Sequence, residues 1–138
     1  MFLKYNLPGI IWALFILILL GLPASDFPET SFLNIPNLDK IVHGGLFLVF
    51  VFLMAIGFYK QNSFSFINKN AVRLSITIGI IYGGITEILQ GSVFTERTSD
   101  IFDLLADIAG CVIGFLLFCL LRNLNWKNKC FKGKRNNF

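Results

Sequence analysis

Long apolar runs alternate with short polar stretches along this chain. The four longest are Leu7 to Leu22, Ile41 to Phe58, Leu74 to Leu89 and Leu104 to Leu121. Each run is slightly shorter than the ~20 residues that a helix needs to cross a bilayer, but polar residues at its ends can extend the helix into the headgroup layer. The pattern predicts an all-α integral membrane four-helix bundle, with helices at about residues 7–23, 40–58, 72–90 and 101–121.

Composition indicates that lipid is the solvent of this chain. Of its 138 residues, 55% are hydrophobic and 14% are charged, whereas about 25% of the residues of a typical soluble domain are charged. The net charge of +4 does not indicate a nucleic-acid partner, because the basic residues flank the apolar runs, where anionic lipid headgroups attract them. The partner that composition predicts is therefore the lipid bilayer.

The two ends of the predicted helices differ in charge, and this difference predicts their orientation. If the N-terminus is cytoplasmic, every Lys and Arg except Lys40 and Arg97 lies on the cytoplasmic side, and all eight acidic residues lie in the outer half. Basic residues accumulate on the cytoplasmic side of membrane proteins. We therefore expect one transmembrane domain at residues 1–122 with both termini cytoplasmic, and a basic cytoplasmic tail at residues 123–138. A cleaved signal peptide is disfavoured, because Leu22 occupies a position that requires a small residue.

Three ionisable residues, His43, Glu87 and Asp107, interrupt the apolar runs. An Asp near the centre of a membrane helix costs roughly 2.5–3.5 kcal/mol on insertion scales, so such residues either pair with one another or form a functional site. Asp39 precedes His43 by one helical turn and Asp103 precedes Asp107 by one turn, so each pair shares a helix face. Glycines lie on the same helix faces as Glu87 and Asp107, and small residues let membrane helices approach closely. We therefore expect the third and fourth helices to bring Glu87 toward Asp103 and Asp107.

The expected polar site lies in the outer half of the bilayer and contains Asp39, Lys40, His43, Glu87, Gln90, Arg97, Asp100, Asp103 and Asp107. One interpretation is a binding or catalytic site. The other is a structural network in which Lys40 and Arg97 neutralise the acids. The acids outnumber these two bases, and an excess of carboxylates requires a cation, a raised pKa or a basic ligand. This imbalance favours the functional interpretation.

The order and spacing of these polar residues resemble the VanZ-like family. The matching motifs are Asp39-Lys40-x-x-His43, Glu87-x-x-Gln90, Arg97 followed by Asp103, and Gly110-x-x-x-Gly114, over about residues 38–118. The resemblance implies a small multi-pass protein of the bacterial inner membrane and cell envelope, in a family whose name derives from glycopeptide antibiotic resistance. This chain departs from the family pattern at Asp107, where Asn is usual, and at Thr95-Glu96, where Pro-Gly is common.

Two functions fit such a site. As a binding protein, the chain would hold a polar or lipid-linked headgroup, such as that of a lipid-linked cell-wall intermediate, with Arg97 at a phosphate or carboxylate and the acids at amines or a metal. As a membrane-embedded enzyme, it would use His43, Glu87 and Asp103 as candidate catalytic residues in acid–base chemistry on a phosphate-bearing lipid. Together with Asp107, these residues could instead hold a divalent cation that acts on the phosphate. One histidine among oxygen ligands suits Mg²⁺ or Mn²⁺. A transporter is disfavoured, because the sequence shows no broken-helix repeat.

Overall fold

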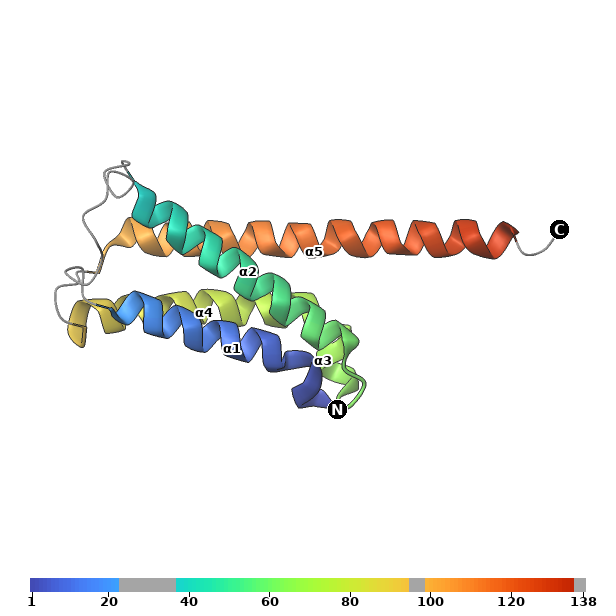
Figure 1. The fold of residues 1–138 in the computed structure, drawn as a ribbon, viewed down its shortest axis with the longest axis horizontal. Coiled ribbons are helices and arrows are strands. Elements are labelled where there is room, and N and C mark those ends of the chain that lie inside the picture. Colours follow the sequence, from blue (N-terminus) through green and yellow to red (C-terminus); the bar gives the residue numbers. More distant parts are fainter. Residues whose placement is uncertain (23–36, 95–98, 136–138) are drawn as a thin grey trace.

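The computed structural model describes residues 1–22, 37–94 and 99–135, with side chains as far as residue 123. Its regular elements are the helices α1 (Phe2–Gly21), α2 (Leu38–Lys60), α3 (Ser65–Lys69), α4 (Ala71–Ser92) and α5 (Ile101–Arg135), shown in Figure 1. In these described ranges, four helices are long and apolar enough to span a membrane, namely α1, α2, α4 and the part of α5 up to Asn123. The predicted all-α fold with four membrane-spanning helices is confirmed, and the orientation of its termini stays a prediction.

The helices extend beyond the apolar runs. α1 begins at Phe2, so Pro8 lies inside it and lacks the N–H that would bond to the carbonyl four residues earlier. α5 continues as far as Arg135, through the segment expected to be a tail. Hydrophobicity marks only the part of a helix that lies in hydrocarbon, whereas backbone hydrogen bonding can continue into the polar residues on either side.

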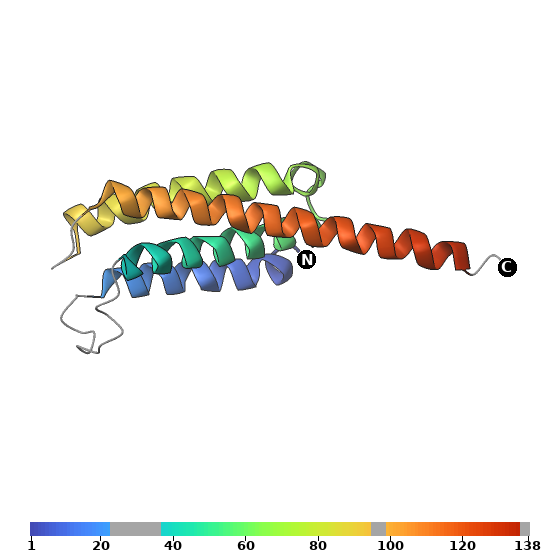
Figure 2. The ribbon, with the colours of Figure 1, turned by 90° about the horizontal axis from the view of Figure 1, so that it is seen from above.

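α2 is the central helix of the bundle. It packs against α1, against α4 and, most extensively, against α5. Figure 2 shows α1 beside α2 and α4 beside α5, with the C-terminal part of α5 running past the other helices. The N-terminus and α3 lie at one end of the bundle, and the starts of α2 and α5 lie at the other (Figure 1). The ends of α1 and α4 reach this second end as well.

The interior contains aromatic side chains from α2 and α4. Phe47 is fully buried and packs edge-on against Phe50, with ring centroids 6.3 Å apart. The ring of Tyr82 on α4 lies 5.3 Å from that of Phe50. Large apolar side chains such as Ile18 and Ile88 face outward instead, with 65% and 68% of their surface exposed. An extensive apolar exterior of this kind marks a surface that contacts lipid.

Glycines bring α2 and α5 into close contact. A Cβ atom at Gly110 would collide with the backbone carbonyl of Gly44, and one at Gly114 would collide with the carbonyl of Leu48. The glycines of α5 therefore pack against α2, whereas the sequence led us to expect them against the preceding membrane helix. The spacing of small residues predicts which face of a helix approaches a neighbour, but not which neighbour it approaches.

Candidate functional site

His43 on α2 and Asp107 on α5 form a buried pair at the interface of these helices. Nδ1 of His43 lies 3.0 Å from Oδ1 of Asp107, and each side chain is only 1% exposed. Gly83 on α4 makes room for the pair, because a Cβ atom there would lie 3.2 Å from Oδ2 of Asp107. When Nδ1 carries the proton, it donates to the carboxylate, and the lone pair of His43 is on Nε2. Both Nε2 and Oδ2 are buried and have no hydrogen-bond partner among the described residues.

Lys40 joins the start of α2 to the start of α5 through two carboxylates. Its ammonium nitrogen lies 2.8 Å from Oδ2 of Asp100 and 3.0 Å from Oδ1 of Asp103. It also lies 5.9 Å from the centroid of the Phe102 ring, within cation–π range. Oδ1 of Asp100 accepts a hydrogen bond from the backbone N–H of Phe102, as a helix N-cap does. The Lys40 ammonium, helped by this N–H, holds the pKa of Asp100 below its ordinary value.

Glu87 on α4 connects to the segment that leads into α5. Its Oε2 accepts hydrogen bonds from the hydroxyl of Ser99 at 3.2 Å and from the backbone N–H of Asp100 at 3.1 Å. Its Oε1 is buried, and the described part of the chain offers it no hydrogen-bond partner. Sequence reasoning missed Ser99, because a single serine in a short polar connection carries no distinctive pattern.

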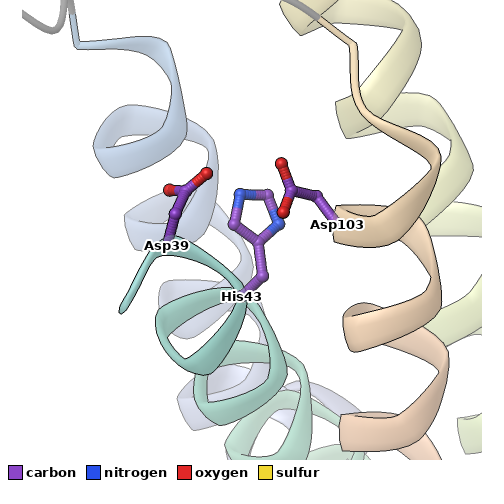
Figure 3. Close-up of side chains that lie close together, drawn as sticks. All are labelled: Asp39, His43 and Asp103. Carbon is purple, nitrogen blue, oxygen red and sulfur yellow. The ribbon is translucent and has the colours of Figure 1, made fainter. Parts of the chain in front are cut away.

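Asp39 forms a compact group with His43 and Asp103 (Figure 3). One potential ligand atom from each of these residues lies within 4.8 Å of the other two. Asp39 and His43 come from successive turns of α2, as their spacing predicts, and Asp103 comes from the first turn of α5. Asp39 is exposed, whereas His43 and Asp103 are buried. The group is therefore open to its surroundings from the side of Asp39.

These contacts join most of the predicted site residues into one polar cluster, which consists of Asp39, Lys40, His43, Glu87, Asp100, Asp103 and Asp107. Gln90 is buried, but its side-chain amide donates to the carbonyl of Leu20 on α1, at 3.4 Å. This hydrogen bond of Gln90 is therefore to α1 and not to the polar cluster. Arg97 lies outside the described residues, so its role stays a prediction.

Charge in the polar cluster is unbalanced. Its described members include five carboxylates, but Lys40 and the imidazole of His43 are the only basic groups among them. Three buried polar atoms, Nε2 of His43, Oε1 of Glu87 and Oδ2 of Asp107, have no hydrogen-bond partner within the described ranges. Such an arrangement can bind a cation or a group rich in hydrogen-bond donors, and a histidine in it can transfer a proton.

Comparison with known proteins gives a family and one curated relative. A family model described as VanZ/LLP1 matches residues 7–122. An uncharacterized protein of Schizosaccharomyces pombe is 35% identical over 85 residues, which cover 62% of this chain and 49% of the relative. The matched part thus spans about half the length of that relative. No solved structure matches the chain.

Proposed function

The chain belongs to the VanZ/LLP1 family, and from this membership and its polar cluster we propose that it binds the polar headgroup of a membrane lipid. The membrane spans of α2 and α5 begin at Leu38 and Ile101. Asp39, Lys40 and Asp103 lie within one helical turn of these starts. We expect these helix starts to lie where a membrane helix meets the headgroup layer, so that a headgroup could reach the polar cluster from the surrounding lipid.

The observation that carries the proposal is the set of three buried polar atoms without a partner in the described chain, on His43, Glu87 and Asp107. Buried polar groups in folded proteins are nearly always hydrogen-bonded, and leaving one without a partner costs about 1–3 kcal/mol. A network that served helix packing alone gains nothing from three such atoms at one end of the bundle. A bound headgroup would supply their missing partners.

The charge of the polar cluster favours a zwitterionic headgroup with an ammonium group. Carboxylates in excess of bases attract a cation and repel a purely anionic lipid. An ammonium group has three N–H donors, and Oε1 of Glu87 and Oδ2 of Asp107 are acceptors. Arg97 is the expected partner of the phosphate. Phosphatidylethanolamine is a simple lipid that carries both groups, and it is the probe that we choose.

We further propose that the polar cluster faces the outer surface of a bacterial inner membrane, in the cell envelope. The N-terminus and the polar cluster lie at opposite ends of the bundle (Figure 1), and the distribution of basic residues favours a cytoplasmic N-terminus. The headgroup of a lipid-linked cell-wall intermediate is then a candidate ligand, and it would connect the site to glycopeptide resistance. The curated relative comes from a yeast, so family membership alone does not determine the membrane or the ligand.

Binding of defined lipids to the purified full chain tests the proposal. Native mass spectrometry in detergent should resolve a complex with one phosphatidylethanolamine, and weaker binding of phosphatidylglycerol with the same acyl chains. Glu87→Gln removes the charge of the carboxylate and keeps its shape. Since a hydrogen bond to a charged group contributes roughly 1.5–3 kcal/mol, this variant should weaken binding at least about tenfold.

Thr86→Val is the matched control for this experiment. Thr86 directly precedes Glu87 in the sequence and is also buried. Its hydroxyl, however, donates to the carbonyl of Gly83 in the same helix. The Thr86→Val variant should therefore bind phosphatidylethanolamine as the wild type does. Equal binding of both lipids by the wild type, or unchanged binding by Glu87→Gln, would contradict the proposal.

The buried pair of His43 and Asp107 favours a second candidate function, acid–base catalysis on the bound lipid. A carboxylate at Nδ1 orients an imidazole so that Nε2 can accept or donate a proton, as in the triads of serine hydrolases. Proteoliposomes that contain the wild-type protein would then convert labelled phosphatidylethanolamine to products, and His43→Gln would bind the lipid without converting it. Absence of product from the wild type would remove this candidate and leave headgroup binding untouched.

A further inference from the structure

Asp39, His43 and Asp103 bring two carboxylates and an imidazole together at the starts of α2 and α5 (Figure 3). One ligand atom from each lies within 4.8 Å of the other two. Ligand atoms lie about 2.0–2.2 Å from a zinc ion, so two ligands of such a cation are separated by at most about 4.4 Å. The three ligand atoms are therefore close to the separations that one cation requires. From this geometry we propose that the three residues bind a divalent cation.

The orientation of His43 is a second observation, independent of the acidic residues. Its side chain is buried, Nδ1 lies 3.0 Å from Asp107, and Nε2 has no hydrogen-bond partner in the part of the chain that is described. Histidines that bind metals usually donate their other ring N–H to a carboxylate or carbonyl, which fixes the tautomer and leaves a lone pair for the ion. Figure 3 shows the ring between the carboxyl groups of Asp39 and Asp103. Asp107 therefore acts as a positioning residue for the imidazole.

Lys40 is the main competitor of a cation for Asp103. Its ammonium nitrogen lies 3.0 Å from Oδ1 of Asp103. The same nitrogen lies closer to Asp100, at 2.8 Å, and the carboxylate of Asp100 suffices to neutralise it. A carboxylate has two oxygens and about four lone-pair sites, so Asp103 can keep a hydrogen bond to Lys40 and still offer an oxygen to the cation.

One nitrogen and two carboxylate oxygens favour Mn²⁺. Carboxylate and water ligands suit Mg²⁺, Ca²⁺ and Mn²⁺, whereas imidazole suits later transition metals. Mn²⁺ shares the preference of Mg²⁺ and Ca²⁺ for oxygen ligands and, as a transition metal, also accepts an imidazole nitrogen, although it binds most weakly in the transition-metal series. Three protein ligands leave coordination positions open, and exposed Asp39 opens them to the surroundings. Water or a phosphate oxygen would complete the coordination.

The cation site does not depend on lipid binding, because all three proposed ligands belong to the protein. Coordination of the bound cation by a lipid phosphate, in contrast, rests on the proposed headgroup site. In a zwitterionic headgroup, the phosphate would coordinate the cation while the ammonium meets Oε1 of Glu87. A cation on Nε2 of His43 also occupies the atom that acid–base catalysis would need, so the bound metal and a histidine base exclude each other.

Titration of the full chain with Mn²⁺ in lipid-free detergent, followed by electron paramagnetic resonance, tests the site. We expect one Mn²⁺ per chain, with nitrogen coupling from one imidazole. His43→Gln should remove this coupling, and Asp39→Asn should weaken binding roughly tenfold or more. Asp39→Glu is the matched variant, because it restores a carboxylate on an exposed side chain and should bind Mn²⁺ nearly as the wild type does.

The Asp107→Asn variant tests whether Asp107 positions the imidazole of His43 without itself binding the cation. Asn keeps an oxygen that can accept from Nδ1 but removes the negative charge of the carboxylate. Mutation of the partner of a metal-binding histidine typically weakens metal affinity about 10–100-fold, so this variant should bind Mn²⁺ more weakly while the nitrogen coupling persists. Absence of stoichiometric Mn²⁺ binding, or equal affinity in Asp39→Asn and the wild type, would overturn the proposal. Since Asp39 is exposed, its variants decide the matter even if the His43 variant fails to fold. Lipid binding without Mn²⁺ binding would overturn the cation site alone.

Discussion

Oδ1 of Asp107 lies 3.0 Å from Nδ1 of His43 across the interface of α2 and α5, and both side chains are buried. This hydrogen bond links helix packing to the chemistry of the site. The carboxylate that joins the two helices also fixes which nitrogen of the imidazole carries the proton. A change at position 107 should therefore affect both the stability of the bundle and the properties of His43.

Asp107→Leu should destabilise the bundle more than Asp107→Asn. Leu leaves Nδ1 of His43 without its acceptor in a buried site, which costs about 1–3 kcal/mol, whereas Asn keeps a carbonyl oxygen that can accept the hydrogen bond. Titration of mixed micelles with SDS measures the free energy of unfolding of each variant. Equal losses in the two variants would show that the hydrogen bond to His43 does not stabilise the bundle.

Gly110→Ala should destabilise the protein strongly, because its Cβ atom would collide with the carbonyl of Gly44 and force α2 and α5 apart. Inserting a methyl group into a tightly packed interface typically costs about 1–3 kcal/mol. Gly45→Ala is the matched control on α2, since a Cβ atom there would have no described atom within 4 Å apart from its chain neighbours and the backbone of its own helix. Alanine is favoured over glycine inside a helix by roughly 0.5–1 kcal/mol, so this variant should melt at or above the wild-type temperature. A lower Tm for Gly45→Ala than for Gly110→Ala would contradict the packing.

The ion pair of Lys40 and Asp100 predicts a loss of stability in acid. The pKa of Asp100 is lowered in the folded protein by Lys40 and by the N–H of Phe102, so ionised Asp100 stabilises the folded state above its unfolded pKa of about 3.9. That contribution is lost as the pH falls through the lower, folded-state value. Glu87, which accepts the N–H of Asp100, and Asp103, which shares Lys40, also face this pair.

The measurement is the Tm in detergent as a function of pH. The wild-type Tm should fall below about pH 4, and the Tm of Asp100→Asn should fall less steeply over the same range. Asn keeps a side-chain oxygen for the N–H of Phe102 but cannot titrate, so the comparison isolates the charge. Parallel curves for the two proteins would exclude a contribution from the ionisation of Asp100.

Tyr82→Phe should lower the free energy of unfolding only slightly. The hydroxyl of Tyr82 on α4 donates to the carbonyl of Ala13 on α1, at 2.6 Å, and Phe keeps the ring that packs against Phe50. Hydrogen bonds between membrane helices contribute about 0.6 kcal/mol on average, so the free energy of unfolding in SDS titration should fall by about that amount. A loss as large as that of Gly110→Ala would mean that this hydrogen bond contributes as much to helix association as glycine packing does, which would contradict the account.

The membrane spans and the family were predictable, because both depend on local properties of the chain. The length of each apolar run predicts a span, and the ordered motifs from Asp39 to Gly114 predict the VanZ-like family, which the match over residues 7–122 confirms. The ends of the helices were less predictable. α5 continues to Arg135, because polar residues outside hydrocarbon can also be helical.

The partners of individual side chains were not predictable, because they depend on how each helix is rotated and placed relative to the others. Gly110 packs against α2, and Gln90 bonds to α1, although the spacing suggested other neighbours for both. Sequence reasoning put His43 near the acids, but only the packing of α2 on α5 shows that Asp107 is its partner. Spacing along one helix defines a face and leaves the opposing residue undetermined.

Contact between a lipid ammonium group and Glu87 is the most direct test of headgroup binding. Solid-state NMR of the protein in liposomes can measure the dipolar coupling between ¹⁵N-labelled phosphatidylethanolamine and the ¹³C-labelled carboxylate of glutamate. A hydrogen-bonded ammonium nitrogen lies about 2.8 Å from a carboxylate oxygen, so we predict a strong coupling in the wild type that disappears in Glu87→Gln. Absence of coupling in the wild type, or the same coupling in the variant, would contradict headgroup binding at the polar cluster.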